Sequence, residues 1–287
     1  MEKQSHPNLP KSAIPRATTK EDKGTTSVFS RPIEPDNYVK DPIPVRLPFK
    51  DWLDYRKVPA ERKPVIILPH VHTMQSFDAF GEYEDYVDTL HNYRLGGMIV
   101  TDHNHHGFCE GERKEPSDKP YLINGSEMIC SYNGRTQGDL IGAFLKDMLK
   151  SEYGDDFGKI ADDIHRKGGL VIIPHPNNDR VSGIRLQDLT EDELAKVDFI
   201  ETHNARHFRE NEQCRKRREM VVGFINDYNK THAHKIRNIV GTDAHGTEEL
   251  TKGLHMVAFE PHVNTPDKMK QALLNGEYHL LVHKKFK

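Results

Sequence analysis

From Pro64 onward, short apolar runs alternate with amphipathic segments, and this alternation limits the folds open to the chain more than any other feature. The runs at residues 65–68, 98–100 and 170–173 predict short buried strands. The segments between such runs repeat apolar residues at helical spacing. Strands that alternate with helices indicate a parallel α/β arrangement. About seven such units, without a glycine-rich phosphate loop, favour a barrel over a dinucleotide-binding sheet.

The same signals predict the remaining elements. Further strands are expected at residues 121–123 with 128–129, 140–145, 197–200 and 236–240. A first helix is expected where Phe80, Tyr83, Val87 and Leu90 repeat at helical spacing, and it should end at Gly96-Gly97. A second is expected over residues 157–164, ending at Gly168-Gly169, and a third over about residues 206–229. Thr190 and Glu193 form a predicted capping box. Thr265-Pro266 begins a last predicted helix, which ends at Asn275-Gly276.

The N-terminal part of the chain has a different character. Of the 17 prolines, 10 lie within the first 64 residues, and those between Ser5 and Pro48 argue against a regular element there. We therefore predict a proline-rich, partly disordered arm at residues 1–60 and a barrel domain at residues 61–287. A tail without a specific partner is favoured over an interaction role for this arm.

Composition excludes some classes of protein. With 41 basic and 44 acidic residues, the net charge is −3, which argues against binding nucleic acid by bulk charge but permits a local basic groove. Apolar runs of at most four residues predict no membrane-spanning helix, and no signal-peptide pattern opens the sequence. The cysteines at 109, 130 and 214 have neither metal nor disulfide spacing, so we predict a reducing, cytoplasmic location.

Residues that can bind metal lie at or beside most of the predicted strands, in a chain that carries 18 histidines. They are His70, His72, Asp102, His103, Glu127, Asp139, His175, Glu201, His203, Asn204, Asp243 and His245. The carboxyl ends of parallel strands meet at the mouth of a barrel. Imidazole nitrogens and carboxylate oxygens are ligands of Zn²⁺, Mn²⁺ and Fe²⁺. Any one of these residues alone has an ordinary structural explanation, but six strand ends together predict a metal site. His105 and His106 are expected near it.

Several of these segments resemble the motifs of the PHP (polymerase and histidinol phosphatase) superfamily. The resemblance rests on segments 68–73 with 76–78, 101–104, 125–127, 174–176 and 241–245. In letters these are LPHVHT with SFD, TDHN, GSE, PHP and GTDAH, and they occur in the order found in the family. Together the motifs are specific, and the resemblance covers residues 64–285.

The resemblance implies a distorted (β/α)₇ barrel with two or three divalent ions, Zn²⁺ or Mn²⁺ or else Fe²⁺, at its carboxyl mouth. It implies that His70, His72, Glu127 and Asp243 hold the first ion. It further implies that His103, His245 and Asp78 hold the second, that Glu127 bridges, and that His175 and Asp139 hold a third. Many members have histidine where Asp139 stands, and this carboxylate changes the charge of the third site. Asp102 is expected either to bind metal or to support a ligand.

The expected chemistry is hydrolysis of phosphate esters by a metal-activated hydroxide, acting on a small phosphorylated molecule or a nucleotide. Arg206 and Arg135 are candidates for phosphate contacts, with ordinary surface arginines as the alternative reading. The basic run at residues 215–218 is expected to be a solvated helix face rather than a nucleic-acid patch. Two alternatives stay open: a nuclease that acts on nucleic-acid ends with the same centre, and a catalytically silent metal-binding barrel. An amidohydrolase is less favoured because no lysine stands at a strand end.

Overall fold

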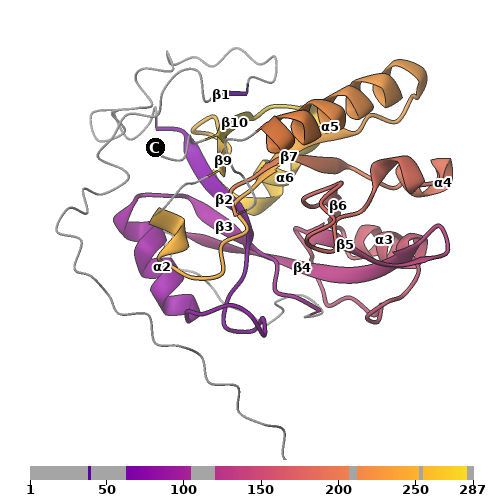
Figure 1. Cartoon of the computed structure of the whole chain (residues 1–287). Coiled ribbons are helices and arrows are strands. Elements are labelled where there is room, and N and C mark those ends of the chain that lie inside the picture. The colour runs from indigo at the N-terminus through magenta and orange to yellow at the C-terminus, as the bar shows by residue number, and fades with distance from the viewer. Residues whose placement is uncertain (1–37, 40–62, 105–119, 207–211, 252–254, 283–287) are drawn as a thin grey trace, which may run out of the picture.

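The fold is described here from a computed structural model, which places residues 38–39, 63–104, 120–206, 212–251 and 255–282. These residues form one ten-stranded sheet in the order β1-β10-β9-β2-β3-β4-β5-β6-β7-β8 (Figure 1). The strands are β1 (Tyr38–Val39), β2 (Val65–Val71), β3 (Gly97–Val100), β4 (Tyr121–Tyr132), β5 (Arg135–Ala143), β6 (Leu170–Ile173), β7 (Phe199–Asn204), β8 (Arg237–Gly241), β9 (His255–Phe259) and β10 (His279–Val282). Most of the predicted N-terminal arm lies outside the described residues, so the domain division stays a prediction.

The central strands run parallel, with two exceptions. β2, β3 and β4 pair in parallel, as do β6, β7 and β8. β5 is antiparallel to both β4 and β6, because it follows β4 through the tight Tyr132–Arg135 hairpin. β9 is likewise antiparallel to β2 and β10. The barrel therefore departs from the all-parallel pattern at two places.

Backbone hydrogen bonds join the two ends of the parallel array into a barrel. The amides of Thr242 and Asp243, directly after β8, donate to the carbonyls of Pro69 and His70 at 2.9 and 2.6 Å. In return, the His72 amide donates to the carbonyl of Ala244 at 2.8 Å. The end of β2 is therefore fastened to the segment that follows β8, at the edge where the parallel strands end.

Helices cover the outside of this sheet. They are α2 (Tyr83–Asn92), α3 (Phe157–Arg166), α4 (Glu191–Leu194), α5 (Glu212–Thr231) and α6 (Pro266–Asn275), with 3₁₀ turns η4 (Leu186–Asp188) and η5 (Glu249–Thr251). In Figure 1, α2 lies on the side of β2 and β3, whereas α3, α4 and α5 lie towards β5 to β7. No helix among the described residues is both long and apolar enough to span a membrane.

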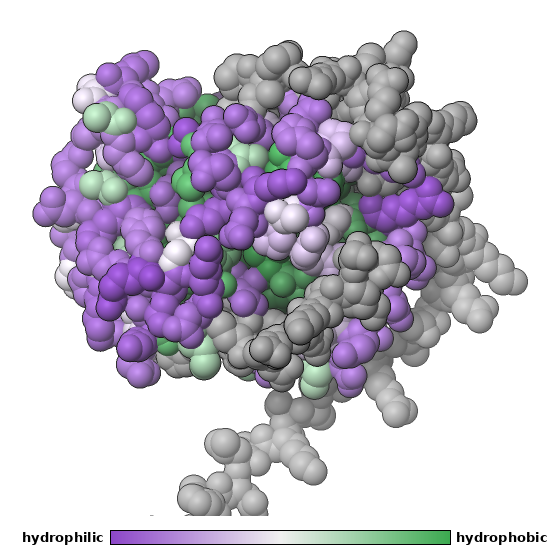
Figure 2. Space-filling view, turned by 180° about the vertical axis from the view of Figure 1, so that it is seen from behind, coloured by the Kyte–Doolittle hydropathy of each residue, from purple (hydrophilic) through white to green (hydrophobic). Residues whose placement is uncertain are grey.

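Three apolar clusters make up the core. The first fills the barrel with one isoleucine or valine from most strands, such as Ile67, Ile141 and Ile239, and includes residues of α6. The second packs α3 and α5 against β4 to β7, and the third packs α2 against β2, β3 and β9. On the face seen from behind, hydrophilic residues cover most of the described surface, and hydrophobic residues show between them (Figure 2).

Local sequence signals predicted several elements correctly. The strand at residues 170–173 and the capping box of Thr190 and Glu193 are confirmed. α6 begins after Thr265, whose side chain accepts a hydrogen bond from the Lys268 amide, and ends at Gly276 in the left-handed region (φ 76°). Only glycine adopts such a backbone conformation without steric cost.

Other predictions were wrong. Phe80 is not part of α2: it precedes the helix and its side chain is 77% exposed. Arg206, the predicted start of the next helix, lies in a turn, and the described part of α5 covers Glu212–Thr231. The proline-rich region contains the short strand β1, which pairs with β10. β9 and β10 were not predicted, because each begins with a buried histidine that hides the apolar pattern.

Candidate metal centre

The barrel mouth gathers side chains from six of the strands and the segments after them. His70 is the last residue but one of β2 and His72 follows the strand, while His103, His175 and the pair Asp243 and His245 follow β3, β6 and β8. Glu127 and Asp139 differ from this pattern, since they lie within β4 and β5. They nevertheless reach the mouth because β4 and β5 continue beyond the ends of their shorter neighbours.

Four ligand-type atoms converge at the first position. His70 Nε2 lies 3.1 Å from His72 Nε2, and both nitrogens lie 3.2 Å from Glu127 Oε2. Asp243 Oδ1 lies 3.7 Å from His70 Nε2 and 3.6 Å from His72 Nε2. All four side chains are buried. This is the set of four that the resemblance assigned to the first ion.

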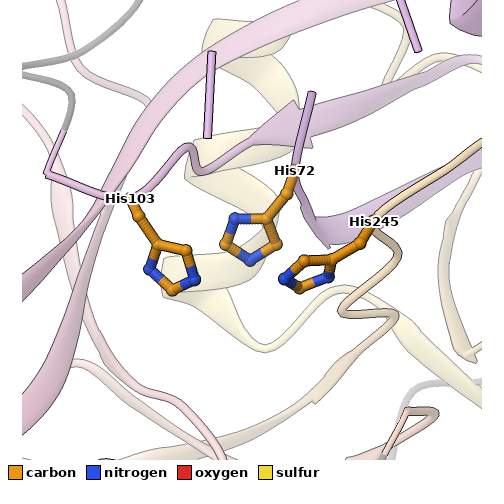
Figure 3. Close-up of side chains that lie close together, drawn as sticks. All are labelled: His72, His103 and His245. Carbon is orange, nitrogen blue, oxygen red and sulfur yellow. The ribbon is translucent and has the colours of Figure 1, made fainter. Parts of the chain in front are cut away.

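A second group faces the first across His72. The imidazoles of His72, His103 and His245 lie side by side although they come from three separate segments (Figure 3). Each offers a ring nitrogen within 4.8 Å of the others. Asp78 Oδ2 lies 3.1 Å from His245 Nε2 and 3.8 Å from His103 Nε2, and Glu127 Oε2 lies 3.4 Å from His103 Nδ1.

The other oxygen of Glu127 belongs to a third group. Glu127 Oε1 lies 3.1 Å from His175 Nε2, and Asp139 Oδ2 lies 3.8 Å from the same nitrogen. Glu127 thus contacts all three groups with its two oxygens. Glu127 lies within β4 opposite His103, three residues beyond the end of β3, which places its carboxylate at the centre of the mouth.

Hydrogen-bond partners assign the protons on two of the histidines. His70 Nδ1 donates to Glu201 Oε1 at 2.7 Å, which leaves the lone pair on Nε2. Ser76 Oγ donates to Asp102, so His72 Nδ1 is the donor in its 3.2 Å contact with Ser76 Oγ. Both Nε2 lone pairs therefore point at carboxylate oxygens. Acceptors that face one another in a buried site are repulsive unless a proton or a cation lies between them.

The pKa values reflect this crowding of acceptors. Burial opposes the charged form of His70, but the carboxylates of Glu127, Glu201 and Asp243 outweigh it and raise its pKa well above the usual value. Burial likewise opposes the charge on Glu127, yet His70 and the hydrogen bond with His175 hold its pKa well below normal. Burial and the neighbouring Glu127 raise the pKa of Asp139 to about 8. The cluster thus calls for positive charge, which a divalent ion would supply in place of protons.

Backbone strain marks the same residues. His70, His175 and Asp243 have φ angles of 60°, 28° and 52°, in the left-handed region that non-glycine residues rarely occupy. Such conformations cost on the order of 1–3 kcal/mol each and persist where the surrounding structure enforces them, commonly at functional sites. Three strained residues at one mouth agree with a site whose side chains are held in fixed directions.

Glu201 supports the centre from behind. Besides His70, it accepts hydrogen bonds from the His175 amide at 2.9 Å and from Asn204 Nδ2 at 3.0 Å. Asn204 also donates to Asp243 Oδ2 at 3.1 Å. Glu201 and Asn204 were named among the metal-binding candidates at strand ends, but neither was assigned to an ion. The signal was their position two and five residues after Phe199, at the end of a buried strand.

Asp102 holds the loop that carries Asp78. It accepts hydrogen bonds from the Thr73 amide at 2.6 Å, the Thr73 hydroxyl at 2.8 Å and Ser76 Oγ at 2.9 Å. Ser76 in turn accepts a hydrogen bond from the His103 amide at 2.9 Å. Both Asp102 oxygens thus accept hydrogen bonds from this loop.

Of Arg206, Arg135, His105 and His106, the structure describes the side chain of Arg206. Arg206 lies two residues after the end of β7, is about one-third exposed, and approaches Glu249 Oε2 at 3.4 Å. The same Glu249 oxygen accepts a hydrogen bond from the His245 amide at 2.9 Å, so Arg206 lies near the centre. The backbone of Arg135 begins β5, but its side chain is outside the described part, as are His105 and His106.

Comparisons with known proteins bear on the fold. No protein-family model matches the sequence, and no curated protein matches it. Among solved structures, one from Bacteroides vulgatus is a two-domain protein containing a predicted PHP-like metal-dependent phosphoesterase. It matches with a TM-score of 0.56 and 15% identity, over 78% of this chain and 66% of that one. About a third of that protein therefore has no counterpart in the match.

Two further solved structures match more weakly. A protein from Bifidobacterium adolescentis proposed to be a metal-dependent phosphoesterase has a TM-score of 0.48 and 13% identity, over 63% of this chain and 88% of that one. Endonuclease Q, bound to a duplex with an abasic lesion, has a TM-score of 0.46 and 12% identity, over 74% and 57%. TM-scores below 0.5 are too low to assign a property to this chain.

The likeness to the Bacteroides protein concerns the fold. It confirms the distorted barrel fold that was predicted from the sequence, in a mixed α/β chain with a nearly closed sheet. The activity of that protein is a separate matter and is not transferred by a fold at 15% identity.

Proposed function

We propose that this protein is a metal-dependent phosphoesterase that hydrolyses an ester of a small phosphorylated molecule or a nucleotide. The observation that carries the proposal is the convergence of lone pairs at the first position. The Nε2 atoms of His70 and His72 lie 3.1 Å apart, and each lies 3.2 to 3.7 Å from one oxygen of Glu127 and one of Asp243, in a geometry that a divalent cation stabilises.

The ligand sets follow from the three groups. We assign His70, His72, Glu127 and Asp243 to the first ion. We assign His103, His245 and Asp78 to the second and His175 with Asp139 to the third, with Glu127 shared. One observation fits the second assignment: Asp78 Oδ1 is buried and makes no hydrogen bond with the described residues. Mixed imidazole and carboxylate donors suit Zn²⁺ or Mn²⁺, with Fe²⁺ as the other candidate.

Bound ions would lower the pKa of a coordinated water towards 7 and neutralise charge on the phosphate oxygens. The chain's own residues prepare the site for this chemistry. Glu201 fixes the direction of His70, and the Asp102–Ser76 pair fixes that of His72. Arg206 at the rim is placed to attract an anionic substrate, and Arg135 stays a second candidate for a phosphate contact.

The alternative nuclease activity would use the same ligands. A net charge of −3 disfavours long contacts with nucleic acid but does not oppose the binding of one terminal nucleotide. The ratio of monoester to diester hydrolysis distinguishes the two substrates.

The test combines metal content with turnover. Protein purified without added metal is analysed for bound metal and assayed with p-nitrophenyl phosphate and its bis ester under Mn²⁺ and Zn²⁺. We expect bound metal and hydrolysis that a chelator abolishes. His70→Ala and Asp243→Ala should each remove activity while the circular dichroism spectrum stays unchanged.

His262→Ala is the matched control, because His262 is exposed and lies outside the centre. Its activity should equal that of the original protein. Full activity in His70→Ala or Asp243→Ala, or activity that survives the chelator, would contradict the proposal. A folded protein without metal or turnover would instead indicate a silent barrel.

A further inference from the structure

Arg217 and Arg218 of α5 line a pocket beside the candidate metal centre. We propose that they form a second anion-binding site, so that the substrate carries a second anionic group besides the phosphate ester. The anion site itself rests only on the pocket, whereas the statement about the substrate rests on the proposed phosphoesterase function. The chemistry of the second group is a phosphate or a carboxylate.

The pocket lies between the end of β7 and α5. It encloses about 430 Å³ of space, part of which is open to solvent. From α5 it is lined by residues one turn apart, namely Cys214, Arg217, Arg218 and Val221. The opposite wall contains His175 and Glu201, which belong to the candidate metal centre or contact it directly. The pocket and the metal centre therefore adjoin, and one small molecule could reach both.

The charges along α5 differ between its two faces. Arg215 makes ion pairs with Glu212 and Glu219 at 2.6 and 2.7 Å, and Lys216 lies 3.5 Å from Glu212. These are exposed pairs on the solvent side of the helix. Arg217 and Arg218 are half-buried, and neither forms an ion pair with a carboxylate among the described residues. The predicted solvated face thus applies only to the first half of the basic run, and the second half faces the pocket.

His203 holds Arg218 in the pocket. Arg218 Nη1 lies 3.3 Å from His203 Nε2, and because a guanidinium only donates, this nitrogen must accept. The other ring nitrogen, His203 Nδ1, lies 3.1 Å from Thr202 Oγ1, which itself donates to the carbonyl of Ile239. Burial, together with His255 and Arg218, lowers the pKa of His203 well below its usual value, so the ring stays neutral. A neutral partner orients Arg218 without cancelling its charge.

The acidic side chain in the pocket wall does not cancel the charge either. Glu201 already accepts hydrogen bonds from His70, the His175 amide and Asn204. Two half-buried arginine residues without a carboxylate partner among the described residues favour an anion, which Arg binds through paired, charge-assisted hydrogen bonds.

Binding is tested first with inorganic sulfate, titrated into the full-length protein as purified and followed by calorimetry. Arg217→Ala/Arg218→Ala should weaken sulfate binding by about tenfold or more, the loss expected for charge-assisted hydrogen bonds. The control Arg215→Ala/Lys216→Ala removes the same charge from the same helix and should change binding less than about twofold, since exposed pairs contribute little. Equal binding by all three proteins would overturn the anion site.

Turnover then identifies the second group, using butyl phosphate, 4-phosphooxybutanoate and butane-1,4-diol bisphosphate. We expect kcat/KM for at least one doubly anionic probe to exceed that for butyl phosphate by about tenfold. Arg217→Ala/Arg218→Ala should abolish this preference and leave butyl phosphate unchanged. The better of the two probes distinguishes a carboxylate from a phosphate.

The outcomes separate the two proposals. An equal loss for all three probes would place the arginines on the ester phosphate and overturn the second site. A sulfate difference without hydrolysis of any probe would support the anion site and contradict the phosphoesterase function. Hydrolysis of a probe, with equal sulfate binding by the variants, would support the phosphoesterase function and contradict the anion site.

Discussion

At the scale of single residues, a proton on His70 Nδ1 decides how the candidate metal centre is arranged. His70 Nδ1 donates this proton in a hydrogen bond to Glu201 Oε1, with 2.7 Å between nitrogen and oxygen, and the Nε2 lone pair is thereby turned towards Glu127 and Asp243. Carboxylate–histidine pairs of this kind orient metal ligands and raise their basicity in metalloproteins. Glu201 is therefore expected to act through His70 rather than on a substrate.

Glu201→Gln tests this role. The amide keeps the shape of the side chain but loses the charge that favours the Nδ1 proton. We expect metal affinity to fall by roughly 10- to 100-fold, the usual effect of removing such a partner. Affinity is measured by competition with a chromogenic chelator. Glu152→Gln, at an exposed glutamate, is the control, and an unchanged affinity in Glu201→Gln would contradict the assignment.

Sequence patterns predicted individual residues unevenly. His70, His72, Glu127 and Asp243 were expected together from the family resemblance and do lie together, although Glu127 lies within β4 rather than at a strand end. That they bind metal stays a prediction. Glu201 was noticed without a role, since its partner His70 is 131 residues away and no local pattern reveals such a contact.

At the scale of elements, the last residue of β8 cannot carry a side chain where it packs against Glu201 of β7. A Cβ atom at Gly241 would lie 2.0 Å from Glu201 Oε1, well inside contact distance. Glu201 has no free space to move into, because its two oxygens are fixed by three hydrogen bonds. Glycine at this position is thus part of how the two strands position the candidate centre.

Gly241→Ala should therefore disturb the site without touching any ligand. We expect a destabilisation of about 1–3 kcal/mol from overpacking, with metal affinity lowered as in Glu201→Gln. Denaturant unfolding and chelator competition measure the two effects. Gly223→Ala is the control: its Cβ meets nothing within 4 Å, so this variant on α5 should be neutral or slightly more stable. Normal affinity in Gly241→Ala would refute the argument.

α3 anchors the loop before it through a buried carboxylate. Asp163 accepts hydrogen bonds from the amides of Lys150 and Ser151. Burial works against the charged form, but these hydrogen bonds outweigh it and lower the pKa of Asp163. A carboxylate with a lowered folded-state pKa contributes stability above its unfolded pKa of about 3.9, and this contribution is lost as pH falls through the folded value.

Asp163→Asn should remove this contribution. We expect a loss of about 1–3 kcal/mol at neutral pH, the cost of unsatisfied buried partners, and a smaller difference from the original protein below about pH 4. Urea unfolding across this pH range measures it. The neighbouring Asp162 is 56% exposed, so Asp162→Asn should have little effect at any pH. A difference that does not depend on pH would contradict the role of the charge.

Element prediction succeeded where the signal is local and failed where tertiary pairing decides. The cap at Thr265 and the strand Leu170–Ile173 are encoded in a few adjacent residues. The reversed direction of β5 is not, since an apolar run looks the same in parallel and antiparallel strands. α5 is polar over most of its length, so its sequence did not show that Arg217 and Arg218 turn inward.

At the scale of the whole molecule, the charge in the barrel mouth links metal binding to stability. Anything that binds the folded protein but not the unfolded chain raises the midpoint of thermal unfolding. We expect Mn²⁺ or Zn²⁺ to raise this midpoint and a chelator to lower it. In Asp243→Ala both effects should shrink. If metal did not change the unfolding midpoint of the original protein, that result would contradict the candidate metal centre.

The overall architecture followed from the order of the motifs, whereas its irregularities did not. Alternating strands and helices with ligand-type residues at the strand ends predicted a distorted barrel, and the fold agrees. The pairings of β9 and β10 depend on contacts between distant segments, and their buried histidines conceal the strand pattern.

The hydrogen bonds between residues 69–72 and 242–244 give the barrel a seam, and the candidate ligands lie on both sides of it. His70 and His72 belong to one lip of the seam, and Asp243 and His245 belong to the other. Contacts across such a long stretch of sequence form late in folding, because the loop they close is large. A metal ion bound there would hold the end of β2 to the segment after β8. Breaking these hydrogen bonds would release a bound ion before the rest of the barrel unfolds, so loss of the ion would mark the first step of unfolding.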